Sequence, residues 1–116
     1  MNNALLAELT DAYQSQTLVP IRGCFFLHEN GVDYACPIVC LTIHRNVTDK
    51  TDTALANDDA ANIALEWAMK TFGDDFIWGM ISAWDGHERI KDDPEYLDGY
   101  ALGEAAARQL NPRDPP

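Results

Sequence analysis

Apolar positions recur at helical spacing in four separate stretches of the chain. The densest stretch carries Phe76, Ile77, Met80, Ile81 and Trp84, which follow one another at steps of one, three and four residues. Such a stripe is typical of a helix that buries one face. Comparable patterns predict helices at about 3–15, 58–72, 75–85 and 94–110, and we expect the last two to pack together.

Between the first two of these helices, the pattern changes to that of a β-hairpin at about 22–36. An apolar run precedes Asn30-Gly31, a dipeptide that suits a tight turn because both central residues must tolerate positive φ. Residues 37–45 have two interpretations. Their β-branched side chains favour a third strand, whereas Pro37 suits the first position of a helix and interrupts a strand. We favour the helix.

These elements predict an α+β fold that is mostly helical, with four to five helices and a small hairpin. At 116 residues, the chain is expected to form a single domain, 1–116. Residues 46–57 are polar and are predicted to form an exposed loop. Residues 111–116 contain three prolines that cannot continue a helix, so we expect this tail to fray.

The net charge is −11, from 19 acidic and 8 basic residues. This charge disfavours nucleic acid and anionic membranes as partners, because both need a cationic surface. Part of the acid has a structural explanation, since Asp pairs precede or begin three predicted helices, where carboxylates are stabilised. No apolar run reaches the length of a membrane span, and no secretion signal is visible. The expected location is the cytoplasm.

Five thiol and imidazole side chains form the first candidate site: Cys24, His28, Cys36, Cys40 and His44. Positions four apart lie about 6 Å from each other on a helix but about 13 Å apart on a strand. A zinc site therefore requires residues 37–45 to be helical and the hairpin to supply Cys24 or His28. A second matching thiolate pair, typical of structural zinc sites, is missing.

Other chemistry is no better supported. The sequence has no C-x-x-C, and a Cys40–His44 nucleophile and base would lack a third group to orient them. We favour reduced cysteines buried in the core and assign no metal or cofactor. The acidic loop Asp85–Glu95 lacks the calcium-binding pattern, so its acids, with His87 among them, are interpreted as a solvated connection.

Small residues recur every four positions in the last predicted helix, at Gly99, Gly103 and Ala107. A second helix can approach such a face closely. The partner is either the helix around Gly79 in the same chain or a second copy in a symmetric dimer. Trp78 lies off the apolar stripe of its own helix, so it either packs on a neighbouring element or marks an interface.

The chain carries no strong catalytic motif. We therefore predict a small soluble, non-enzymatic interaction or regulatory module that binds a protein partner and forms a homodimer. The interface candidates are Trp78, Gly99, Gly103 and Ala107. One alternative is a metal-binding or thiol-dependent protein that uses the face of Cys36, Cys40 and His44. Another is an acidic protein that engages a basic partner.

Overall fold

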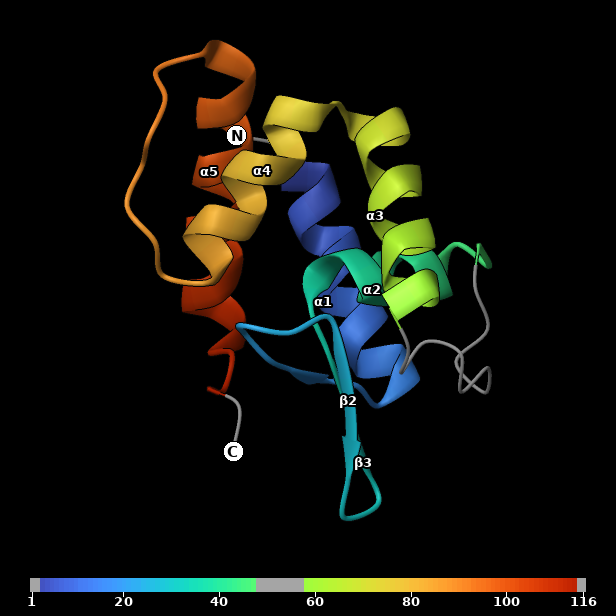
Figure 1. Cartoon of the computed structure of the whole chain (residues 1–116). Helices are drawn as coiled ribbons and strands as arrows, with labels where there is room; N and C mark the ends of the chain where they lie inside the picture. Colours follow the sequence, from blue (N-terminus) through green and yellow to red (C-terminus); the bar gives the residue numbers. More distant parts are fainter. Residues whose placement is uncertain (1–2, 48–57, 115–116) are drawn as a thin grey trace.

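The computed structural model describes residues 3–47 and 58–114. Along this part of the chain the elements are α1 (Asn3–Gln16), β1 (Val19–Pro20), β2 (Phe26–Glu29), β3 (Val32–Ala35), α2 (Pro37–His44), α3 (Asp58–Phe72), α4 (Asp74–Trp84) and α5 (Pro94–Leu110). Figure 1 shows the helices gathered into one body, from which the β2–β3 hairpin projects. The prediction of a mostly helical α+β fold is confirmed.

The helix boundaries follow local chemistry that the sequence contains. The Asp93 carboxylate caps α5 by accepting hydrogen bonds from the backbone N–H groups of Glu95 and Tyr96, at 3.0 and 3.4 Å. Gly73 separates α3 from α4 with a φ of 100°, which costs glycine little. The two aspartates after it lie in the first turn of α4, at the positive end of the helix dipole. The side chains of the Asp pair that begins α3 lie outside the described residues.

Residues 37–44 form a helix, as Pro37 favours. Pro37 occupies the start of α2, and Cys36 is the N-cap residue. Every residue of α2 except His44 is buried. A segment buried on all sides shows no clear period, which explains why the sequence pattern left both a helix and a strand open. Of the loop predicted at 46–57, residues 48–57 lie outside the described residues.

The predicted hairpin is present, with Asn30 and Gly31 as its two-residue turn. Both adopt positive φ, 53° and 77°, as this turn requires. The strands pair antiparallel, with Phe26 opposite Ala35. The ladder begins at Phe26 and not near residue 22, because the chain first turns at Gly23, where φ is 79°.

The third strand of the sheet is β1, which the sequence pattern did not predict. It pairs parallel with β3, so that Val19 lies opposite Tyr34, and the strand order is β1-β3-β2. Two residues are too few to show the alternation that identifies a strand. Pro20 is tolerated there because β1 lies at the edge of the sheet.

Helices α4 and α5 run parallel and side by side, because the connection between them returns along α5 to its start (Figure 1). Glycines allow the two backbones to touch. A Cβ on Gly99 would lie less than 3.0 Å from the carbonyl oxygen of Phe76, and one on Gly103 would lie equally close to that of Met80. Gly79 meets the α5 backbone in the same way. The predicted packing of these helices is therefore present within the chain.

Trp84 joins α4 to two other elements at the centre of the core. Its indole N–H donates a hydrogen bond to the Ile21 carbonyl at 2.7 Å. Its ring stacks on that of Tyr13 from α1, with centroids 6.2 Å apart. The Tyr13 hydroxyl in turn donates to the carbonyl of Ala35, at the end of β3. These contacts fix the sheet against α1 and α4.

The segment after α5 is held against the sheet. The Arg113 N–H donates to the Pro20 carbonyl at 3.0 Å, and the Arg22 N–H donates to the Arg113 carbonyl at 2.9 Å. Pro112, which directly precedes Arg113, is buried. In the tail that we expected to fray, the backbone of Arg113 thus has hydrogen-bond partners far away in the sequence. Residues 115–116 lie outside the described residues.

Candidate functional site

Two of the five thiol and imidazole candidates lie side by side in the protein interior. Cys36 and Cys40 are one turn apart at the start of α2, and both are buried. The Gln16 side chain donates a hydrogen bond to the Cys40 carbonyl at 3.3 Å, and its nitrogen lies 3.8 Å from the sulfur. Cys40 therefore faces α1 and the core, not an open cleft.

The two histidines lie away from these thiols and pair with acids. The His28 Nδ1 lies 2.5 Å from an Asp33 carboxylate oxygen across the hairpin. His44 is exposed at the far end of α2, with its Nε2 3.9 Å from the Glu8 carboxylate. Among the described residues, no three of the five candidates bring their ligand atoms within reach of one metal ion.

Burial keeps the thiols protonated. It raises the pKa of Cys36 to about 12 and raises the pKa of Cys40 well above its usual range. The pKa of Cys24 is also raised, first by partial burial and then by the negative charge of Asp85. Because the thiolate is the reactive form, none of the three is activated as a nucleophile.

This state of the thiols predicts a simple alkylation pattern. In the folded protein, iodoacetamide should modify Cys24 slowly and leave Cys36 and Cys40 unmodified until the chain unfolds. The rate at Cys24 should rise about tenfold per pH unit below its pKa, since the thiolate fraction does so. Mass spectrometry of timed samples measures both quantities. Fast modification of Cys36 or Cys40 at neutral pH would contradict the buried, protonated state.

Three carboxylates form a small cluster where α4 and α5 begin, next to the acidic loop. Oxygens of Asp75, Asp93 and Glu95 lie within 4.8 Å of one another. Two of these side chains already have structural partners, because Asp93 caps α5 and Asp75 pairs with the Lys91 ammonium at 3.0 Å. The helix cap and the ion pair therefore account for this cluster of carboxylates.

The interface candidates divide into two sets. Gly99 and Gly103 contact α4 of the same chain. Of the two partners expected for the small-residue face, the intramolecular helix is therefore the one present. Ala107 is half-buried and packs against the core. Trp78, in contrast, is 45% exposed. Of the four, Trp78 is therefore the side chain that presents a large apolar surface to solvent.

Trp78 belongs to a face of α4 that continues into a pocket. Ile81 and Asp85 follow it at steps of three and four residues, so the three share one side of the helix. Ile81 and Asp85 line a pocket of about 150 Å³ between α4, the start of the hairpin and the start of α2. Further lining comes from Gly23, Cys24, Phe25, Cys36, Pro37, Met80 and Trp84.

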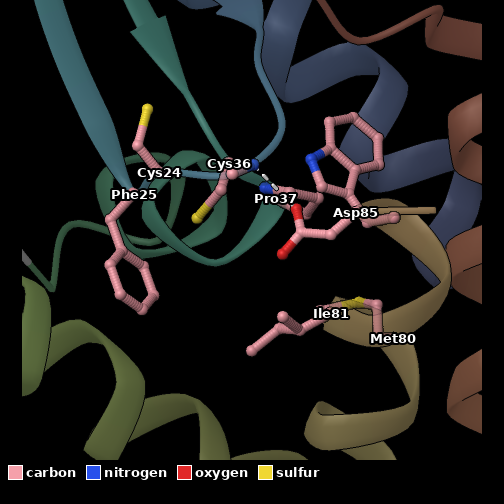
Figure 2. Close-up of a pocket in the computed structure, with 9 residues that line it drawn as sticks. Cys24, Phe25, Cys36, Pro37, Met80, Ile81 and Asp85 are labelled. Carbon is pink, nitrogen blue, oxygen red and sulfur yellow. Dashed lines mark hydrogen bonds between the residues drawn. The ribbon is translucent and has the colours of Figure 1, made fainter. Parts of the chain in front are cut away.

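Figure 2 shows how the lining side chains lie. The Asp85 carboxylate and the Cys36 sulfur are turned toward the space between Phe25 and Ile81, whereas the Cys24 sulfur points away from it. One Asp85 oxygen accepts a hydrogen bond from the backbone N–H of Gly23 at 2.9 Å. The pocket is thus mostly apolar, with one carboxylate at its wall.

Sequence reasoning did not predict this pocket. In the sequence, Asp85 stands among the acids of a loop, whereas its hydrogen-bond partner Gly23 lies 62 residues away. The helical period does place Trp78, Ile81 and Asp85 on one face, and this pattern is recognisable from the sequence alone. The other wall, from Cys24 and Phe25, depends on long-range packing that periodicity does not contain.

No family model, curated protein or solved structure matches this chain. In the described part of the chain, no helix combines the length and apolar character needed to cross a membrane. A function must therefore be inferred from the geometry of the chain's own residues.

Proposed function

We propose that this chain is a non-enzymatic interaction module that binds a basic protein segment through the exposed face of α4. The observation that carries the proposal is the exposure of Trp78, which is 45% accessible, while Trp84 on the same helix is almost fully buried. Tryptophan is enriched among the residues that dominate binding energy at protein interfaces. A solvent-facing Trp78 offers such an anchor.

Acidic side chains next to Trp78 indicate the chemistry of the partner. Asp74 and Asp75 lie four and three residues before it, and Asp85 lies seven residues after it, on the same side of α4. An arginine or lysine of a partner can stack on the indole while it pairs with Asp74, or with the oxygens that Asp75 and Asp85 do not use for Lys91 and Gly23. The net charge of −11 attracts such a partner over longer distances.

A second copy of the chain is the alternative partner that the sequence favoured. Two chains of net charge −11 repel each other, so self-association would have to overcome this repulsion and would strengthen with salt. Binding of a basic segment would weaken with salt instead. The faces of Gly99 and Gly103 are already covered by α4, so a dimer would have to use other residues, such as Trp78.

Replacing Trp78 should separate these possibilities. In an anisotropy titration with a labelled peptide of alternating arginine and leucine, Trp78→Ala should weaken binding at least tenfold, roughly the loss typical of an interface anchor. Raising salt from about 0.1 M to about 1 M should also weaken binding, because the Debye length falls from about 10 Å to about 3 Å.

The matched control is Ile63→Ala on α3, because Ile63 is 56% exposed but lies on another helix. This variant should bind the peptide like the wild type. Equal affinity of Trp78→Ala and wild type would contradict the proposal. A dimer by light scattering that persists at high salt and is lost in Trp78→Ala would favour the homodimer instead.

A further inference from the structure

The pocket beside Asp85 has the size of a small-molecule site. Its volume is about 150 Å³, and an apolar cavity of about that volume holds a benzene-sized molecule. Phe25 and three residues of α4, Met80, Ile81 and Trp84, supply most of an apolar lining from two parts of the chain. A ligand for this pocket therefore needs a compact apolar body.

One charged group faces this apolar space. The Asp85 carboxylate uses one oxygen for the Gly23 N–H and retains further acceptor capacity on its two oxygens. Among the described residues, no cation pairs with Asp85 within 4.0 Å; the nearby Arg22 is directed to Asp114 at 3.7 Å. The carboxylate can therefore accept a hydrogen bond from a ligand.

The position of Asp85 strengthens the preference for a cation. It is the C-cap residue of α4, where the helix dipole is negative and a carboxylate is not stabilised by it. The start of α2, with its positive dipole end, also adjoins the pocket. There, however, the Cys36 side chain makes no cap hydrogen bond, and burial raises the pKa of this thiol to about 12, so that it adds no charge.

We infer that this pocket binds a small organic ammonium ion with a benzene-sized apolar body, such as an arylmethylamine. The ammonium group donates hydrogen bonds to the Asp85 carboxylate, and the ring lies among Phe25, Met80 and Ile81. No covalent step is involved. Trp78 does not line the pocket, so the Trp78→Ala variant separates this inference from the proposed binding of a basic protein segment, although both use Asp85.

The test is a titration of the full chain with three ring compounds of nearly equal size. Benzylamine should bind at least tenfold tighter than benzyl alcohol, because a charge-assisted hydrogen bond is stronger than a neutral one. Benzoate should not bind detectably, since its charge has the same sign as Asp85. Amide chemical shifts should change at Phe25 and Ile81.

Asp85→Asn isolates the carboxylate, because asparagine keeps an oxygen for the Gly23 N–H. It should lower benzylamine affinity at least tenfold, to that of benzyl alcohol. Asp92→Asn, an exposed acid outside the pocket, and Trp78→Ala should leave benzylamine binding unchanged. Equal binding of the amine and the alcohol by the wild type, or unchanged binding in Asp85→Asn, would overturn the inference.

A second variant locates the site if Asp85→Asn fails to fold. Ile81→Phe places extra volume in the pocket and should abolish binding of both the amine and the alcohol. Undiminished benzylamine binding by Ile81→Phe would mean that the compound binds elsewhere, which also overturns the inference.

Discussion

Gly99→Ala should destabilise the protein by about 3 kcal/mol, at the upper end of the usual cost of overpacking. The new methyl group would lie less than 3.0 Å from the backbone oxygen of Phe76. Backbone cannot rotate away as a side chain can, so α4 and α5 would have to separate. Chemical denaturation followed by circular dichroism measures the loss, and calorimetry should show a Tm lower by roughly 10–15 °C.

The direction of the stability change distinguishes overpacking from helix propensity. Helix propensity alone predicts that alanine stabilises a helix interior by about 1 kcal/mol relative to glycine. Glu104→Ala, at an exposed position of the same helix, serves as the control and should change stability by no more than about 0.5 kcal/mol. A Gly99→Ala variant more stable than the wild type would mean that the helices are not in backbone contact.

Trp84→Ala should cost about 4–5 kcal/mol, the largest loss we expect from one truncated side chain. Removing a buried tryptophan leaves a cavity, which typically costs about 3–5 kcal/mol. The change also deprives the Ile21 carbonyl of its buried donor, which adds to the loss. Since small domains are stable by only about 5–15 kcal/mol, the variant should be close to unfolding at room temperature.

Trp78→Ala is the matched control for this change, because it removes the same side chain from the same helix at an exposed position. It should lose less than about 1 kcal/mol. Urea titrations of both variants, followed by far-ultraviolet circular dichroism, provide the comparison. Similar losses in the two variants would show that Trp84 is not the central contact between α4, α1 and the sheet.

Local chemistry was sufficient to predict most of the fold. The four predicted long helices end within one residue of their observed bounds, because their apolar stripes, caps and glycines lie within a few residues of each other. The Asn30-Gly31 turn is equally local. What could not be predicted depends on distant partners: β1 needs β3, and Arg113 needs Pro20.

For the candidate sites, too, local patterns could be predicted from the sequence and long-range packing could not. Periodicity placed Cys36 and Cys40 on one face of a helix, but it could not show that this face is buried against α1. Exposure of Trp78 was left open by the sequence because a residue off the apolar stripe can pack elsewhere. The pocket at Asp85 was invisible, since its two walls come from segments about 60 residues apart.

The pairing of Arg113 with Ile21 and its neighbours affects how the chain folds during synthesis. The bridge joins a residue near the start of the chain to one more than ninety positions later, so the contact order of this part of the fold is high, and such contacts form slowly. During synthesis, α1 and the hairpin emerge well before residues 111–114, so the edge of β1 stays uncovered until this segment is made. An uncovered strand edge can pair with other chains. By pairing with residues 20–22, the segment 111–114 should therefore protect a newly made protein against aggregation at β1.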